Sequence, residues 1–183
     1  MTRFQLAIIK QVVDSGGIIA YPTEGVFGLG CRPDDYIAVK NILKIKKRPA
    51  AKGLILIASN IRQILPFIVK PHKSTWSKMT ETWPGHISWA IAASDSCPAW
   101  IKGENPTVVV RVSKHPVVRA ICNTLGYAIV STSANISSQV ALDNALKVRK
   151  ALGDRLDLIV PGATLNRKKP SSIFNAQDGK QLR

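Results

Sequence analysis

The spacing of apolar residues along the chain predicts a series of short helices. Apolar residues at helical spacing follow Thr2 and Gln5, a pair typical of a capping box, and glycine at 16 or 17 ends this first helix. Pro116 suits the first position of a later helix that ends near Gly126. Four other helices are predicted. One begins at Asp34 or Asp35 and ends over 46–49, and a short one is capped by Ser59 and ends at Leu65. The last two cover 74–83 and 143–152.

Continuous apolar runs predict strands between these helices. The clearest is the β-branched run Val108–Val112, and the first run, 18–21, is stopped by Pro22. Further strands are predicted over 54–58, 86–92, 128–131, 158–160 and 172–174. Because strands and helices mix without strict alternation or an internal repeat, we expect an α/β fold with a mixed twisted sheet and flanking helices, in a single domain over 1–183.

Composition narrows the class of protein. The 183 residues are 45% apolar and 20% charged, and no apolar run approaches the roughly 18 residues of a membrane helix. We expect no secretory signal, no membrane association and a cytoplasmic location. The three cysteines and three histidines have no spacing typical of a disulfide framework or a metal site, so no bound metal is predicted.

The net charge of +15, from 26 Lys and Arg against 11 Asp and Glu, favours polyanionic partners such as RNA or nucleotides. A solvated basic face is the alternative. Five of these cations lie close together at the end of the second helix: Lys44, Lys46, Lys47, Arg48 and Lys52. Cations suit a helix C-terminus, but this many would repel one another without an anion, so phosphate binding and a solvated face stay equally open.

Three further segments have polar residues next to strands. The segment Tyr21–Gly30 turns through three glycines; it could bring backbone N–H groups close to a ligand or be a plain turn, and it matches neither standard phosphate loop. Ser131–Asn135 follows a strand and could bind a ligand or cap the next helix. Arg111 lies inside an apolar strand and could face solvent or bind a carboxylate.

Taken together and in this order, the segments resemble the YrdC/TsaC family of threonylcarbamoyl-AMP synthases. The similar motifs are spread over nearly the whole chain, and the length is similar to that of the short bacterial form. They are Tyr21-Pro22-Thr23-Glu24 with Gly28 and Gly30 behind it, Lys46-Lys47-Arg48-Pro49, Lys52-Gly53-Leu54, Thr107 to Arg111, His115-Pro116, Ser133-Ala134-Asn135 and Pro170-Ser171.

The resemblance implies a YrdC-like fold with a concave basic surface, and it implies an enzyme, a nucleotidyltransferase. L-threonine, bicarbonate and ATP would give L-threonylcarbamoyladenylate and pyrophosphate, for threonylcarbamoyladenosine formation in tRNA. It implies that the catalytic residues are Lys46 and Arg48. It also implies ATP binding by Lys46, Arg48, Lys52, Thr107, Ser133 and Asn135, and threonine binding by Thr23, Arg111, Ser131 and Ser171. Two positions depart from the pattern: Gly25 replaces a side chain, and the last basic residue is the terminal Arg183, whose end position argues against a role.

The implied cofactor requirement is ATP as a substrate with Mg²⁺, without a tightly bound cofactor. Weak tRNA or double-stranded RNA binding and downstream tRNA threonylcarbamoyl-transfer proteins are the further expected partners. One alternative is a non-catalytic RNA-binding or ribosome-associated factor, favoured by the charge. Another is a carbamoyl or acyl transferase domain of a larger assembly. We expect both Lys46 and Arg48 to be exposed at the helix end.

Overall fold

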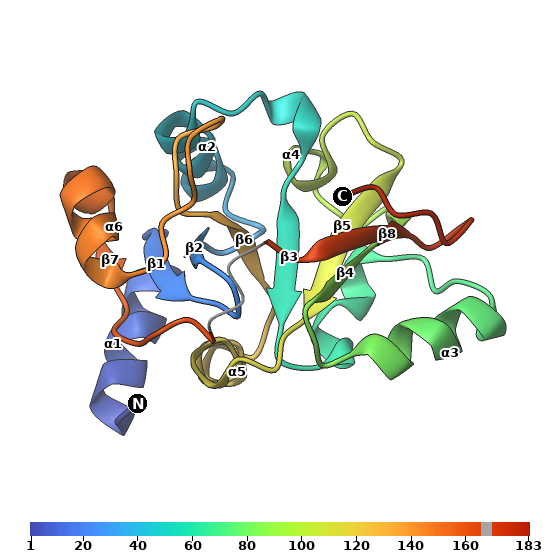
Figure 1. Cartoon of the computed structure of the whole chain (residues 1–183), viewed down its shortest axis with the longest axis horizontal. Helices are drawn as coiled ribbons and strands as arrows, with labels where there is room; N and C mark the ends of the chain where they lie inside the picture. The colour runs from blue at the N-terminus through green and yellow to red at the C-terminus, as the bar shows by residue number, and fades with distance from the viewer. Residues whose placement is uncertain (166–169) are drawn as a thin grey trace.

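The computed structural model describes residues 1–165 and 170–183, and within them the strands form one eight-stranded mixed sheet flanked by helices (Figure 1). The strands, in order across the sheet, are β7 (Leu158–Ile159), β1 (Ile19–Pro22), β2 (Phe27–Gly30), β6 (Ile129–Ser133), β3 (Ile55–Ala58), β5 (Thr107–Val112), β4 (Ile87–Ala92) and β8 (Ser172–Asn175). The pairs β1–β7, β3–β5 and β4–β8 are parallel, and the other four are antiparallel. The expected α/β fold with a mixed sheet is confirmed.

The helices begin and end largely where the sequence predicts. The helices are α1 (Arg3–Asp14), α2 (Tyr36–Lys46), α3 (Lys73–Thr82), α4 (Ala99–Lys102), α5 (Pro116–Leu125) and α6 (Ala145–Leu152). Thr2 and Gln5 form the predicted capping box, and the Asp35 carboxylate accepts from the N–H of Ala38 at the start of α2. Gly126 ends α5 in the left-handed conformation, with φ 85°, which glycine adopts without steric cost.

One local prediction was wrong, and two elements were not predicted. Ser59 caps no helix: its hydroxyl bonds Gln63 and Asn123, and the chain makes two 3₁₀ turns, η2 (Ile61–Gln63) and η3 (Leu65–Phe67), because Pro66 prevents a continuous α-helix. The glycine-rich segment turns over 23–26 and then holds a strand, β2, that was not predicted. The short helix α4 was not predicted.

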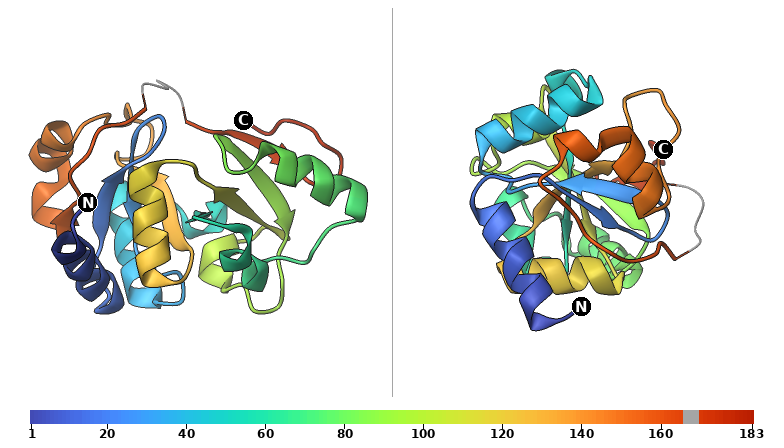
Figure 2. Two further views of the ribbon diagram at one scale, coloured as in Figure 1. Left: turned by 90° about the horizontal axis from the view of Figure 1, so that it is seen from below. Right: turned by 90° about the vertical axis from the view of Figure 1, so that its left-hand side faces the viewer.

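The sheet has two buried faces with separate clusters. On one face Tyr21, Ile57 and Ile129 pack with α1 and α5; on the other, Leu56, Val110 and Val130 pack with helices that include α2. Figure 2 shows α1 and α5 on the opposite side of the sheet from α2. Across the sheet, β7, β1, β2 and β6 form one half, and β3, β5, β4 and β8 form the other.

Residues at matching positions in neighbouring strands share a face. The pairs Tyr21↔Gly28, Gly28↔Ser133 and Ile57↔Arg111 place Gly28, Ser133 and Arg111 on the same face as the α1–α5 cluster. Val110, the neighbour of Arg111 in β5, packs in the opposite cluster, as the alternation of side chains along a strand requires. Across 1–165 and 170–183, no helix is long and apolar enough to cross a membrane.

Candidate functional site

A cavity of about 270 Å³ lies on the sheet face that carries Gly28, Ser131 and Arg111, beyond the part of this face covered by α1 and α5. Most of the residues predicted as site residues line it, although they come from distant segments of the chain. These residues are Thr23, Lys46, Arg48, Lys52, Arg111, Ser131, Ser133, Asn135 and Ser171. Thr107 does not line the cavity: it starts β5, four residues before Arg111, which is about 13 Å away along an extended strand.

Lys46 is held by the loop after β6. Its ammonium donates hydrogen bonds to the carbonyl oxygens of Ser133 and Asn135 and to the side-chain oxygen of Asn135, the last two at 2.9 and 3.0 Å. The residue is only 2% exposed, so the expectation of an exposed Lys46 was wrong. The helix end turns its last residue inward because the loop offers three oxygen acceptors there. Burial, with the nearby charge of Arg48, lowers the pKa of Lys46 to about 8.

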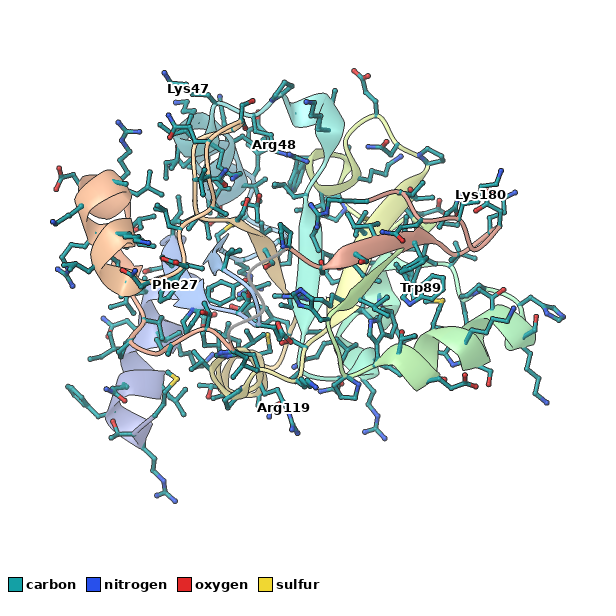
Figure 3. The ribbon with its side chains drawn as sticks, in the orientation of Figure 1. Phe27, Lys47, Arg48, Trp89, Arg119 and Lys180 are labelled. Atoms are coloured by element: carbon teal, nitrogen blue, oxygen red, sulfur yellow. The ribbon has the colours of Figure 1, made fainter. Side chains whose placement is uncertain are left out.

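Arg48 is fixed by a neighbouring turn and is half-buried. Its Nε and Nη2 atoms both donate to the carbonyl of Gly53, at 3.0 and 2.9 Å. Gly53 has φ 59°, and a Cβ there would lie 2.6 Å from the carbonyl of Lys102, so only glycine allows this close packing against α4. Figure 3 labels Arg48 beside the segment that leads to β3, and Lys47 at the outer rim. The guanidinium is thereby positioned at the cavity wall before any ligand binds.

Arg111 is paired with a carboxylate of the protein. Its Nη2 atom lies 3.3 Å from Oε2 of Glu24, and its Nη1 lies 3.3 Å from Nδ1 of His86. The other oxygen of Glu24 accepts from the Ser113 hydroxyl at 2.7 Å and from the N–H of Lys114 at 3.2 Å. Glu24, from the loop after β1, therefore gives Arg111 an acidic partner within the protein.

The charge of Glu24 is maintained by its neighbours. Burial on its own would raise the pKa of this carboxyl, but the Arg111 charge and the Ser113 hydrogen bond outweigh it and hold the pKa below its usual value. Glu24 is 0% exposed and is not among the described residues that line the cavity. Arg111 therefore borders the cavity and is paired with the buried carboxylate of Glu24, which does not line it.

Small hydroxyl groups form the part of the cavity near Arg111. The Thr23 hydroxyl donates to the carbonyl of Val26 at 2.7 Å, and the Ser171 hydroxyl lies 2.8 Å from that of Ser88. Ser131 projects from β6 on the same face. Gly28 leaves room above them, since a Cβ there would lie 3.5 Å from both the Ser131 hydroxyl and the Thr23 methyl.

Arg183 reaches the cavity from the end of the chain. Its guanidinium donates from Nε and Nη2 to the carbonyl of Ser171, at 3.2 and 3.0 Å, and its own carbonyl accepts from the N–H of Ile173 at 3.1 Å. Arg183 lines the cavity, so its end position does not keep it away from the site. Burial, then the charges of Arg111 and Arg48, lowers the pKa of Arg183.

Sequence reasoning missed two residues at this site. Glu24 stood inside a quoted motif without a role, although an acidic residue two positions after a buried strand was a usable signal. His86 borders the cavity and gave no signal, because a histidine at a strand start has many uses. The lining cations, Lys46, Arg48, Lys52, Arg111 and Arg183, face no acidic lining residue within the described ranges, so the cavity suits an anionic ligand.

Comparison with known proteins gives a consistent result. The Sua5/YciO/YrdC family model, described as telomere recombination, matches residues 11–183. A threonylcarbamoyl-AMP synthase from Nitrosococcus oceani is 41% identical over 181 residues, which cover 99% of this chain and 98% of that protein.

Solved structures show the same fold. The structure of P. abyssi Sua5 complexed with L-threonine matches with a TM-score of 0.90 and 26% identity; the match covers 96% of this chain and 52% of the longer one. E. coli YciO matches with a TM-score of 0.87 and 22% identity over 98% of this chain and 87% of its own length, a likeness of fold alone.

Proposed function

Because the chain belongs to the Sua5/YciO/YrdC family, we propose that it converts L-threonine, bicarbonate and ATP into L-threonylcarbamoyladenylate and pyrophosphate. The observation that carries this proposal is the composition of one cavity, in which cations from α2 and η1 (Ala50–Lys52) adjoin a hydroxyl-lined region with a buried arginine. That arrangement suits a polyphosphate in one part and an amino-acid carboxylate in the other. The product would serve threonylcarbamoyladenosine formation in tRNA.

The chemistry requires two bond-forming steps. The amine of threonine combines with bicarbonate to give a carbamate and water, and a carbamate oxygen then attacks the α-phosphorus of ATP while pyrophosphate leaves. Neither step needs a covalent bond to the protein, so positioning and stabilisation of negative charge dominate catalysis. We assign these tasks to fixed cations rather than to a nucleophilic side chain.

The nucleotide would lie against the α2 end of the cavity. Arg48 and Lys52 line this end and would contact the triphosphate, and Lys46 would hold Ser133 and Asn135 in position as well as contribute charge. Because Arg48 is already fixed by Gly53, little side-chain entropy is lost when it binds phosphate. Mg²⁺ would arrive with ATP as part of the substrate.

Threonine would lie in the region of Thr23, Ser131 and Ser171, with its carboxylate toward Arg111. One Nη of Arg111 is turned to Glu24 and the other to His86, so both guanidinium nitrogens are orientated before substrate binds. Thr107 lies at the start of β5, about 13 Å from Arg111 along the strand, and the nucleotide contact that the family motif implies for it stays a prediction.

Pyrophosphate release tests the proposal directly. Purified protein with MgATP should release pyrophosphate when both L-threonine and bicarbonate are present, and mass spectrometry should detect the threonylcarbamoyladenylate. Arg48→Ala, which removes a proposed phosphate contact, should release pyrophosphate more slowly than wild-type protein at low ATP concentration. Equal pyrophosphate release without threonine would overturn the proposed function. A purely RNA-binding factor, the competing hypothesis, is not favoured, because the relatives similar over their full length are named as synthases. Contact with tRNA and hand-over of the product to downstream proteins remain part of the proposal.

A further inference from the structure

The loop after β6 contains a buried hydroxyl group that makes no hydrogen bond within the protein. Across 1–165 and 170–183, two buried side-chain oxygens have no hydrogen-bond partner: Oε2 of Glu24, which faces Arg111, and the hydroxyl oxygen of Ser137. Ser137 lines the catalytic cavity. A buried hydroxyl without a partner has lost the hydrogen bonds that it would make in water, which is unfavourable. A ligand in the cavity can supply the missing partner.

The backbone of Ser137 is fixed beside the last residue of α2. Its N–H donates to the carbonyl of Lys46 at 2.8 Å, and the Lys46 ammonium donates in turn to oxygens of Ser133 and Asn135 in the same loop. Figure 1 shows this loop, in orange, beside α2. The side-chain amide of Asn135 donates to the carbonyl of Gln139 at 2.6 Å, which closes the loop. The position of Ser137 relative to α2 is therefore set before a ligand binds.

A strained turn places Ser137 at the cavity. The N–H of Gln139 donates to the carbonyl of Ile136 at 3.0 Å, so Ser137 and Ser138 are the central residues of a β-turn. Ser138 has φ 70°, a conformation that glycine usually supplies at the third position of a type II turn. A serine there is strained, and strain of this kind is concentrated at functional sites. Ser138 also lines the cavity, so both central residues of the turn border it.

The neighbouring charges determine what the Ser137 hydroxyl can bind. Lys46, which contacts Ser137, and Arg48 both line the cavity, and its lining in the described part of the chain contains no Asp or Glu. As an ammonium, Lys46 already uses its three donors on loop oxygens, so it cannot donate to a phosphate unless one of those contacts breaks. The hydroxyl of Ser137 can donate to a phosphate oxygen instead, after rotation about the Cα–Cβ bond.

We propose that the Ser137 hydroxyl donates a hydrogen bond to a phosphate oxygen of the bound nucleotide, in a position that Lys46 sets through the loop. The identity of the nucleotide rests on the proposed function, but nucleotide binding requires neither threonine nor bicarbonate. MgATP affinity without threonine therefore tests the Ser137 contact, and threonine-dependent pyrophosphate release tests the synthase.

Isothermal titration calorimetry with MgATP, in the absence of threonine, compares wild-type protein with three variants. Ser137→Ala removes the hydroxyl, and Ser137→Thr keeps it. Ser59→Ala is the matched control, because the Ser59 hydroxyl is also buried but bonds Gln63 and Asn123 away from the cavity. Chemical denaturation without nucleotide measures the stability of each protein.

Ser137→Ala should weaken MgATP binding by roughly tenfold, as expected for the loss of one hydrogen bond to a charged group. Ser137→Thr should bind almost as tightly as wild-type protein. Ser137→Ala should be at least as stable as wild-type protein, because it removes a buried group that has no partner. Ser59→Ala should show the opposite pattern, with lower stability and unchanged affinity. Lower stability and unchanged affinity in Ser137→Ala would show a purely structural role and overturn the proposal.

Two further ligands locate the contact. Adenosine should bind equally to wild-type protein and Ser137→Ala, because adenosine has no phosphate. The KM for bicarbonate in the complete reaction should also be unchanged. Equal weakening of adenosine and MgATP binding would overturn the proposal and assign the hydroxyl to the sugar or the base. A higher KM for bicarbonate with unchanged MgATP affinity would overturn it and assign the hydroxyl to the carbamate.

These measurements separate the Ser137 contact from the proposed function. Unchanged MgATP affinity in Ser137→Ala, with threonine-dependent pyrophosphate release by wild-type protein, would overturn the contact alone. Weaker MgATP binding by Ser137→Ala, with no such release by wild-type protein, would support the contact and overturn the synthase. Wild-type protein that binds no MgATP would overturn both.

Discussion

Arg111 and Glu24 form a buried ion pair at the edge of the catalytic cavity, with 3.3 Å between Nη2 and Oε2. The side chains are 6% and 0% exposed, so water screens their attraction poorly. The pair joins β5 to the loop between β1 and β2, which belong to different halves of the sheet. It therefore positions a proposed substrate contact and also holds the two halves together.

Replacing Glu24 with glutamine should destabilise the protein and change its acid denaturation. Loss of the anion leaves Arg111 as an unpaired buried cation, which costs about 3 kcal/mol in the free energy of unfolding. The pKa of Glu24 is lowered in the folded state, so ionised Glu24 stabilises the fold at pH values above its pKa in the unfolded chain. This stabilisation is lost as the pH falls through the pKa of Glu24 in the folded protein. Urea unfolding from pH 7 to pH 3 should show a smaller loss of stability for Glu24→Gln. Asp154→Asn, in the short turn η4 (Gly153–Arg155), is the control. An unchanged wild-type pH dependence in the variant would mean that the pair contributes nothing.

Binding of ATP should transfer a proton to Lys46. In the free protein the pKa of this lysine is about 8, so at pH 8.5 most of the population is neutral. A bound triphosphate brings negative charge, raises that pKa and draws a proton from the buffer. Isothermal titration calorimetry at pH 8.5 in two buffers of different ionisation enthalpy should therefore report uptake of a substantial fraction of one proton.

Lys46→Met should abolish this proton uptake, whereas Lys147→Met on α6 should keep it. The same shift affects stability: the unfolded chain binds more protons than the folded one between pH 8 and about 10.5, so Lys46 makes stability rise with pH in that window. Calorimetric enthalpies that do not depend on the buffer would contradict a neutral Lys46 in the free protein.

Arg48→Ala should raise the KM for ATP by roughly 10- to 100-fold, the range for loss of one charge-assisted hydrogen bond. The fold should persist, because Arg48 is half-buried and its partners are two carbonyls of a turn. Steady-state kinetics and thermal unfolding check the two statements. Lys44→Gln, four residues earlier on the exposed face of α2, is the control and should leave the KM unchanged. A KM effect confined to threonine would move Arg48 out of the nucleotide site.

Lys46→Ala should differ from Arg48→Ala in stability. Lys46 binds three oxygen atoms of residues 133 and 135, so its removal leaves buried acceptors without a partner and loosens the loop after β6. We expect a loss of about 1–3 kcal/mol in the free energy of unfolding besides a higher KM for ATP. Equal stability of the two alanine variants in chemical denaturation would show that Lys46 does not support the loop.

Sequence patterns predicted most of the helices and strands, because these elements depend on residues that are close together in the chain. The capping box at Thr2, the cap at Asp35 and the β-branched run of β5 each depend on residues within a few positions. The strand β2 was missed for a tertiary reason. Gly30 is glycine because a Cβ there would lie 2.7 Å from the ring of Tyr21 and 2.7 Å from the carbonyl of Val130, contacts that no pattern within β2 reveals.

The sequence predicted most of the residues that line the cavity, but it did not predict which residues they contact. The family resemblance assigned a binding role to nine of the lining residues, whereas Arg183 was discounted and His86 was missed. The sequence predicted that Lys46 is exposed to solvent, and it indicated no acidic partner for Arg111 within the protein. Both errors have one cause: the partners of these cations lie 87 to 89 residues away for Lys46, and on another strand loop for Arg111.

Arg111→Lys should raise the KM for threonine far more than the KM for ATP. The guanidinium can donate to Glu24 and still present N–H groups to a substrate carboxylate, because its five donors lie in a fixed plane. A lysine ammonium keeps the charge and can satisfy Glu24, so the fold should survive, but it lacks the second arm of the fork. The loss in threonine binding should be on the order of 2–3 kcal/mol, the upper part of the range for a charge-assisted hydrogen bond. Kinetics with each substrate varied separately measure it, and Ser171→Ala, at another proposed threonine contact, should show a smaller effect of the same selectivity. An equal rise for both substrates would mean that Arg111 supports the cavity as a whole, and an unchanged threonine KM would remove Arg111 from the threonine site.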